Sequence, residues 1–145
     1  MISATEQALS NLVEINEMGR ESSIEQKKAL SLPQYLKEYC TVKFFSGRQT
    51  GQTTAAVNLF NNKNNFFIFP TEEITREHEE KFKIINSINK DSALAMSPFK
   101  NYRYYVIDLA FMWGNPEKNL LYLKIAKIPK AISERKKETT IIFIG

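Results

Sequence analysis

The chain has 145 residues, of which 43% are apolar, 12% aromatic and 25% charged. This length fits one domain of ordinary size, and these fractions exclude a chain that is disordered throughout. One cysteine and one histidine exclude an internal disulfide framework and a metal centre built on several thiolates or imidazoles. The net charge of +4 is compatible with nucleic acid but does not require it.

The hydropathy pattern gives an expectation about compartment. No stretch approaches the roughly 20 apolar residues that cross a bilayer. The segment Met1–Arg20 lacks the basic region and apolar core of a signal peptide. We therefore expect a cytoplasmic protein with no membrane partner, kept in a reducing environment.

The first 40 residues are expected to form an N-terminal helical segment. Apolar residues at helical spacing predict a first helix that ends at Gly19. The capping-box pair Ser22 and Glu25 predicts a second, short helix. Pro33 fits the first turn of a third helix, which would run to Tyr39.

From Thr41 the sequence alternates between strand and helix patterns. The expected strands are Thr41–Phe45, Phe66–Phe69, Tyr102–Leu109 and Thr140–Gly145, and the expected helices are Ala55–Phe60, Glu72–Ile88 and one that begins at Asn115 and breaks near Pro129. Such alternation predicts parallel strands joined by right-handed crossovers, with helices on both faces of the sheet. Sheets of this kind bind ligands at the carboxyl ends of their strands.

A loop with the character of a phosphate-binding site follows the first expected strand. It comprises Ser46, Gly47, Arg48, Gln49, Thr50, Gly51, Gln52, Thr53 and Thr54. In the pattern G-x-x-x-x-G-K-[ST], backbone N–H groups wrap the phosphates, the Lys reaches the outer phosphates and the hydroxyl binds Mg²⁺. Gly51 and Thr53 match this pattern, whereas Ser46 replaces the first Gly and Gln52 replaces the Lys.

A second element of such sites lies in the third expected strand. The apolar run Tyr104–Ile107 ends in Asp108, which is the pattern of the Walker B carboxylate that holds Mg²⁺. Thr53 and Asp108 are thus the candidate metal ligands, with ATP or another nucleotide as the candidate cofactor. The competing interpretation of Asp108 is a solvated carboxylate in the turn after the strand.

The segment Gly47–Thr54 resembles the loop of phage terminase large-subunit ATPases, commonly S-R-Q-x-G-K-T-T. The resemblance implies that Arg48 acts as an arginine finger in cis, a candidate catalytic residue beside Asp108. The family's apolar-apolar-D-E-x-A-F pattern is similar to Val106–Phe111, which lacks the Glu. Leu109 follows Asp108 directly, and the chain ends before the family's coupling motif is complete. The resemblance covers about Thr41–Gly145.

The departures from the pattern argue against efficient hydrolysis. Gln52 carries no charge, and losing one preorganised charge stabiliser typically costs a factor of about 10²–10³ in rate. Leu109 removes the group that would activate water. Lys43 or Arg48 could replace the missing cation, and Glu72 or Glu73 the missing acid.

The fold that we predict is a small α/β, P-loop NTPase-like three-layer sandwich. It has a mostly parallel sheet of about four strands (41–145), preceded by the helical segment (1–40), in a single domain. A complete core of this type normally has at least five strands. We therefore expect a minimal or truncated core whose sheet edge is covered by the N-terminal helices or by a partner chain.

A basic segment between Lys118 and Lys137 has two interpretations. Lys124, Lys127, Lys130, Arg135, Lys136 and Lys137 could follow a nucleic-acid backbone, or they could form the charged face of an amphipathic helix. The second interpretation is preferred. The aromatic residues of Phe66–Phe69 and Tyr102–Tyr105 are expected in the core and on the sheet rather than in a base-stacking platform.

Three isolated residues carry weaker signals. His78 lies in an acidic helix, which could suggest a metal site, and a solvated helix face is the preferred interpretation. Cys40 is expected to be a small buried residue without a nucleophilic role. Trp113 either lies near the site after Asp108 or anchors the loop.

Three functions remain open from the sequence. The first is a degenerate, terminase-like protein that binds phosphate or nucleotide with little hydrolysis, as a regulatory or assembly module, in the host cytoplasm if phage-encoded. The second is an active ATPase, related to DNA packaging or helicases, that a partner completes. The third is a scaffold that binds protein or DNA without nucleotide. A protein partner or self-association is expected in each case.

Overall fold

A computed structural model of the chain describes residues 2–45, 51–95, 101–109, 112–127 and 139–145. The strands are β1 (Thr41–Phe44), β2 (Asn65–Phe69), β3 (Ser87–Asn89), β4 (Tyr104–Asp108) and β5 (Thr140–Ile144). The helices are α1 (Ala4–Gly19), α2 (Ile24–Ala29), α3 (Leu32–Tyr39), α4 (Gln52–Phe60), α5 (Glu72–Phe82), α6 (Lys90–Ala95) and α7 (Asn115–Ala126), with a 3₁₀ turn at Arg20–Ser23. The predicted α/β class is confirmed.

The strands form one parallel sheet in the order β1-β5-β4-β2-β3. Side chains alternate between its two faces, as period-2 geometry requires. In β2, Phe66 and Ile68 join one apolar cluster, whereas Phe67 and Phe69 join the other. The continuous apolar runs of the sequence therefore reflect strands that are buried on both faces.

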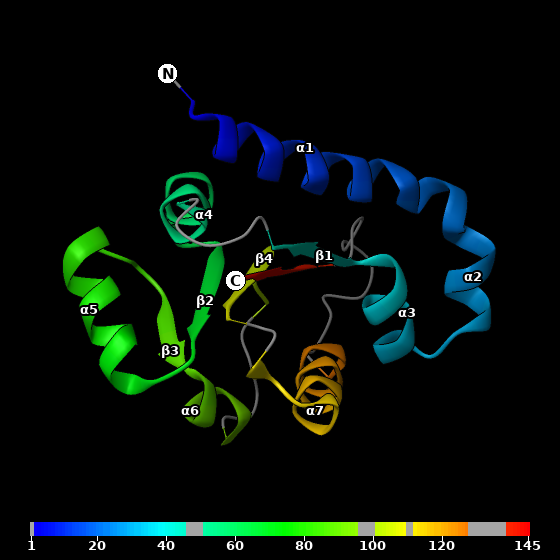
Figure 1. Cartoon of the computed structure of the whole chain (residues 1–145). Coiled ribbons are helices and arrows are strands. Elements are labelled where there is room, and N and C mark those ends of the chain that lie inside the picture. The colour runs from blue at the N-terminus through cyan, green and yellow to red at the C-terminus, as the bar shows by residue number, and fades with distance from the viewer. Residues whose placement is uncertain (1, 46–50, 96–100, 110–111, 128–138) are drawn as a thin grey trace.

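Helices cover both faces of this sheet (Figure 1), an arrangement compatible with a three-layer α/β sandwich. Residues of α1, α4 and α5 pack on one face, and residues of α3, α6 and α7 pack on the other. The strand order determines which helices lie on which face of the sheet. Connections that run from β1 toward β3 carry α4 and α5, and connections that run back carry α6 and α7. Right-handed crossovers put opposite directions on opposite faces.

The predicted helix Glu72–Ile88 is too long. In the structure α5 ends at Phe82, because Lys83 adopts a left-handed backbone conformation with φ 55° and ends the helix there. The chain then forms β3, which the sequence analysis missed. The sheet therefore has five strands among the described residues instead of about four, and it is wholly parallel. This fifth strand removes the basis for expecting a minimal core.

The N-terminal helices follow their local signals closely. The predicted end of α1 at Gly19 is confirmed, and the hydroxyl of Ser3 accepts a hydrogen bond from the backbone N–H of Glu6 at its start. Pro33 lies in the first turn of α3, as predicted. The predicted capping pair does not open α2, since Ser22 lies in the 3₁₀ turn before it.

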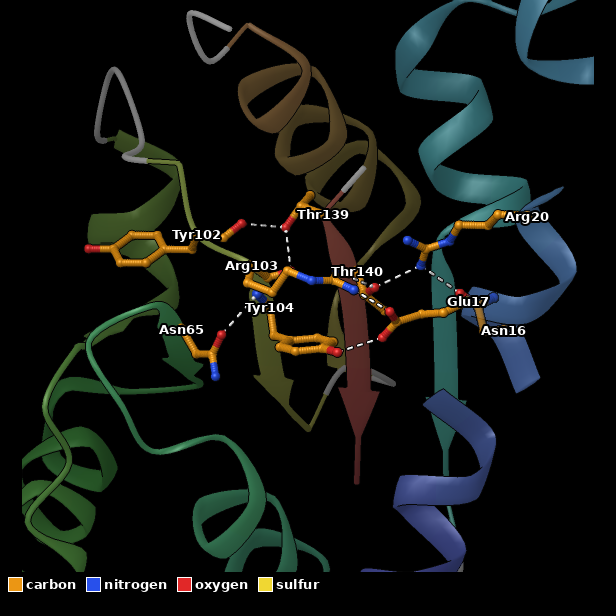
Figure 2. Close-up of polar contacts among 9 residues, drawn as sticks. All are labelled: Asn16, Glu17, Arg20, Asn65, Tyr102, Arg103, Tyr104, Thr139 and Thr140. Atoms are coloured by element: carbon orange, nitrogen blue, oxygen red, sulfur yellow. Dashed lines mark hydrogen bonds and ion pairs between the residues drawn. The ribbon is translucent and has the colours of Figure 1, made fainter. Parts of the chain in front are cut away.

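A polar network joins α1 to the amino-terminal edge of the sheet (Figure 2). The carboxylate of Glu17 accepts hydrogen bonds from Arg103 and from the hydroxyl of Tyr104 at the start of β4. Arg20 donates to Thr140 Oγ1 over 2.7 Å at the start of β5. Together with Leu9, which is fully buried in the cluster beneath α1, these contacts fix α1 on the sheet. Elements other than α1 contribute the residues at the opposite, carboxyl edge of the sheet.

In the part of the chain that the structure describes, no helix combines the length and the apolar character that a membrane span needs.

Candidate functional site

The candidate site lies at the carboxyl edge of the sheet. Of the predicted phosphate loop, Gly51, Gln52, Thr53 and Thr54 belong to the described residues. Ser46, Gly47, Arg48, Gln49 and Thr50 lie outside them, so the predicted finger role of Arg48 and the predicted cradle in this stretch stay predictions.

Gly51 forms the start of α4 in a left-handed backbone conformation. Its φ of 72° is one that L side chains rarely adopt, so glycine at this position has a structural reason. In the described part of the chain, no side chain makes a capping hydrogen bond at this helix start. The first turn of any helix has backbone N–H groups without intrahelical partners, and these attract anions. Among the described residues, the start of α4 therefore keeps backbone N–H groups that an anion such as phosphate could contact.

Thr53 and Asp108 meet across the sheet edge. The Thr53 hydroxyl donates to Asp108 Oδ2 over 3.3 Å. Thr53 belongs to the first turn of α4, and Asp108 is the last residue of β4, so 55 positions separate them in sequence. The two candidate metal ligands are thus brought together at one carboxylate oxygen. A hydroxyl and a carboxylate are oxygen ligands that Mg²⁺ accepts.

Asp108 is held in a fixed orientation. Leu109 has a φ of 54°, and its backbone N–H turns back to donate to Asp108 Oδ1 over 2.8 Å. A left-handed conformation costs a non-glycine residue about 1 kcal/mol, so this turn is strained. The consequence is that Oδ1 is occupied and Oδ2 is directed to Thr53.

The carboxyl group of Asp108 is buried, with 7% of the residue exposed. Desolvation raises its pKa above the ordinary value, and this is the largest influence. The hydrogen bond from Leu109, the nearby imidazole of His78 and the hydroxyl of Thr53 act in the opposite direction. A buried carboxylate with a raised pKa at a strand end is unlike the solvated turn residue that the competing interpretation proposes. It is the kind of group found at binding and catalytic sites.

Gln52, at the position of the missing Lys, is directed toward β5. Its side chain is buried, and its Oε1 accepts a hydrogen bond from the backbone N–H of Gly145 over 2.9 Å. The amide therefore ties the start of α4 to the residue that follows β5. It supplies no positive charge to the site.

Of the replacements suggested for the missing groups, Arg48 lies outside the described residues. Lys43 and Glu73 are exposed. Glu72 is exposed as well and forms a 2.6 Å ion pair with Arg76 on the surface of α5. Nothing in the described part of the chain brings either acid to Asp108.

His78 was interpreted as part of a solvated helix face, and this interpretation is wrong. Its ring packs on Phe69 at 4.7 Å and on Phe82 at 5.6 Å between centroids. Its Nε2 lies 3.9 Å from Asp108 Oδ2. A sequence signal existed, because Ile74, His78 and Phe82 share one side of α5 at a spacing of four residues. The charged residues around them obscured this stripe.

The residues that could follow a nucleic-acid backbone form no basic patch in the part of the chain that the structure describes. Lys124 is half-buried and Lys127 is exposed on α7. Lys130, Arg135, Lys136 and Lys137 lie outside the described residues, as does the predicted break near Pro129. The nucleic-acid interpretation therefore stays a prediction.

The aromatic residues and the cysteine lie where the core interpretation puts them. Phe66–Phe69 and Tyr105 are buried, and Cys40 is fully buried without a disulfide. Trp113 is 4% exposed and packs in the cluster on the α7 side of the sheet, which favours an anchoring role for it.

Taken together, a helix start, a hydroxyl, a buried carboxylate and an imidazole converge at one sheet edge. Among the described residues no group of three or more His, Cys, Asp or Glu side chains could enclose a metal ion by itself. A cation bound here would need further ligands, which the phosphate oxygens of a nucleotide and water can supply.

Comparisons with known proteins add no assignment. A scan against models of protein families found no match, and a search of curated proteins found no matching relative. The likeness to terminase loops is therefore a resemblance of short motifs, and the site stands on its own geometry.

Proposed function

We propose that this chain is a degenerate, terminase-like P-loop protein that binds the phosphate groups of a nucleotide together with a divalent cation. The loop 46–54 would hold the phosphates, and Thr53 and Asp108 would hold the cation. Turnover would be slow or absent, so that the chain acts as a regulatory or assembly module in the cytoplasm, with a protein partner.

One observation supports this proposal above all others. The Thr53 hydroxyl and the Asp108 carboxylate lie 3.3 Å apart, although one begins a helix and the other ends a strand. An oxygen pair of this kind beside an uncapped helix start is the arrangement that a cation–phosphate complex needs. The burial of Asp108 and its contact with the first turn of α4 support a role for this carboxylate at the proposed site.

Low turnover follows from the groups at the critical positions. Phosphoryl transfer depends on positioned positive charge and on a group that orients water. The side chain of Gln52 is neutral and held by Gly145. Leu109 offers no proton acceptor in its side chain.

The test is a calorimetric titration of the full chain with ATP, ADP and a non-hydrolysable ATP analogue, with and without Mg²⁺. Two matched variants accompany it. Asp108→Asn removes the carboxylate of the site, and Asp91→Asn makes the same change at the exposed Asp91 in α6. We expect binding that depends on Mg²⁺ in the wild-type chain and in Asp91→Asn, and its loss in Asp108→Asn.

Other outcomes would redirect the assignment. Rapid phosphate release by the wild-type chain in a turnover assay would support an ATPase. No binding at millimolar nucleotide, in a chain shown to be folded, would contradict the proposal and favour a scaffold for protein or DNA.

A further inference from the structure

The imidazole of His78 is the polar group at the carboxyl edge of the sheet that the proposed function leaves without a role. It is the only histidine of the chain. It reaches the site from α5, whereas Thr53 comes from α4 and Asp108 from β4. In the described part of the chain this ring has aromatic neighbours and the carboxylate of Asp108, and no hydrogen bond accounts for its orientation.

The strand order makes the carboxyl edge between β2 and β4 a position where parallel sheets commonly bind ligands. The helix after β2 lies on one face of the sheet, and the helix after the neighbouring β4 lies on the other. The two connections therefore leave the carboxyl edge toward opposite faces between β2 and β4, which is the arrangement at such a binding point. His78 and Asp108 lie on the two sides of this divergence.

The distances to Asp108 Oδ2 are compatible with Thr53 and His78 as two further ligands of the same cation. Thr53 Oγ1 lies 3.3 Å, and His78 Nε2 3.9 Å, from the same Oδ2 atom of Asp108. Neighbouring ligand atoms of a six-coordinate ion lie about 3 Å apart. The His78 side chain is 22% exposed. An approach of about 1 Å toward Asp108 Oδ2 would bring Nε2 to the spacing of neighbouring ligand atoms.

We propose that His78 is a direct ligand of the cation at this site, together with Thr53 and Asp108, and that it makes the site select Mn²⁺ over Mg²⁺. Carboxylate, hydroxyl and phosphate oxygens accept both ions. An imidazole nitrogen favours the later ion, because Mg²⁺ strongly prefers oxygen. This inference rests on the proposed function, since phosphate oxygens and water must complete the coordination.

The experiment measures Mn²⁺ coordination by pulsed electron paramagnetic resonance on the full chain, purified without a histidine tag. Samples contain Mn²⁺ alone and Mn²⁺ with the non-hydrolysable ATP analogue. Because the chain has one histidine, a nitrogen coupling of imidazole type has a single protein source, and ¹⁵N-labelled histidine separates it from nitrogen of the nucleotide base. His78→Phe keeps the ring contact with Phe69 and removes the nitrogen. Glu80→Gln, on the exposed face of α5, is the control.

We expect the ¹⁵N coupling in the wild-type chain and in Glu80→Gln, and its absence in His78→Phe. The wild-type chain should bind the Mn²⁺ complex of the analogue about tenfold more tightly than the Mg²⁺ complex. In His78→Phe this preference should fall to within about twofold, while binding with Mg²⁺ persists.

Each other outcome has a definite meaning. Nucleotide binding without the ¹⁵N coupling, and with the same metal preference in His78→Phe, would overturn the inference and leave the proposed function intact. If the nucleotide does not bind but Mn²⁺ alone shows the coupling, the proposed function fails and the metal site stands. If neither the nucleotide nor Mn²⁺ binds, both are overturned.

Discussion

At the residue scale, burial opposes the charge of the Asp108 carboxylate, and the hydrogen bonds from Leu109 and Thr53 offset this cost only in part. Desolvation raises the pKa of this carboxyl group above its ordinary value. A raised folded-state pKa means that the folded chain is most stable when Asp108 is protonated. Without a cation, this contribution is fully present below the ordinary pKa of Asp. It is lost as the pH rises through the raised value.

Asp108→Asn should therefore stabilise the chain at pH 7 in a buffer that contains a chelator. The neutral amide can keep the hydrogen bond from Leu109 without the cost of burying a charge. We expect a gain of about 1 kcal/mol in the free energy of unfolding, or roughly 3 °C in the melting temperature. The gain should disappear near pH 3. Thermal unfolding measures it, with Asp91→Asn as the control, and a loss of stability at pH 7 would contradict the account.

Gln52→Lys tests whether the missing charge limits nucleotide binding. A Lys at this position would add a charge-assisted contact to the outer phosphates, and we expect ATP to bind about tenfold more tightly in the presence of Mg²⁺. Gln52→Met is the control, because it also loses the hydrogen bond to Gly145 but adds no charge. An equal gain in Gln52→Met would mean that release of the loop matters, and that charge does not.

Residue-level prediction from the sequence was uneven for a physical reason. The types and spacing of Thr53 and Asp108 follow a known ligand pattern, so their proximity could be anticipated. The approach of His78 to Asp108 depends on which strands are neighbours, and β2 lies beside β4 only in the folded sheet. The left-handed turn at Leu109 has no signal in its side chain.

At the element scale, the end of α5 is the clearest departure from local propensity. The helical pattern continues past Phe82, but Lys83 adopts a φ of 55° and the chain enters β3. This strand has three half-buried residues, Ser87–Asn89, and no apolar run that could reveal it. Its existence depends on pairing with β2, which is a tertiary interaction. Strands β2, β4 and β5 were predictable because nearly all of their residues are buried, on both faces of the sheet.

Lys83→Gly should stabilise the chain by about 1 kcal/mol, because glycine adopts the left-handed conformation without steric cost. Lys83→Ala is the matched control, since alanine carries the same steric penalty as lysine and should leave stability within about 0.5 kcal/mol. Urea unfolding of the three chains distinguishes them. Equal stability of the glycine and alanine variants would show that Lys83 carries no strain.

At the scale of the whole molecule, the parallel direction of the strands puts the polar network and the candidate site at opposite edges of the sheet. The network around Glu17 lies at the amino-terminal edge (Figure 2), where β4 and β5 begin. The candidate site lies at the carboxyl edge, where β4 ends. The alternation of strands and helices predicted the α/β class. The order β1-β5-β4-β2-β3 was not predictable from it, because many orders satisfy the same alternation.

Glu17→Gln should destabilise the chain without changing the site. It leaves Arg103 without its ionic partner, and Glu17 is largely buried with 16% of its side chain exposed. We expect a loss of about 2 kcal/mol in urea unfolding. Glu14→Gln, an exposed position on the same helix, should change stability by less than about 0.5 kcal/mol. Equal effects of the two variants would show that the network does not hold α1 to the sheet.

A decisive measurement of cation binding at Thr53 and Asp108 compares ATP binding by the wild-type chain and by Thr53→Val, each with and without Mg²⁺. Valine keeps the shape of the side chain and removes the hydroxyl that donates to Asp108. The account predicts that Mg²⁺ strengthens binding to the wild-type chain at least about tenfold. In folded Thr53→Val, Mg²⁺ should have little effect. The same Mg²⁺ dependence in both chains, or none in the wild-type chain, would contradict it.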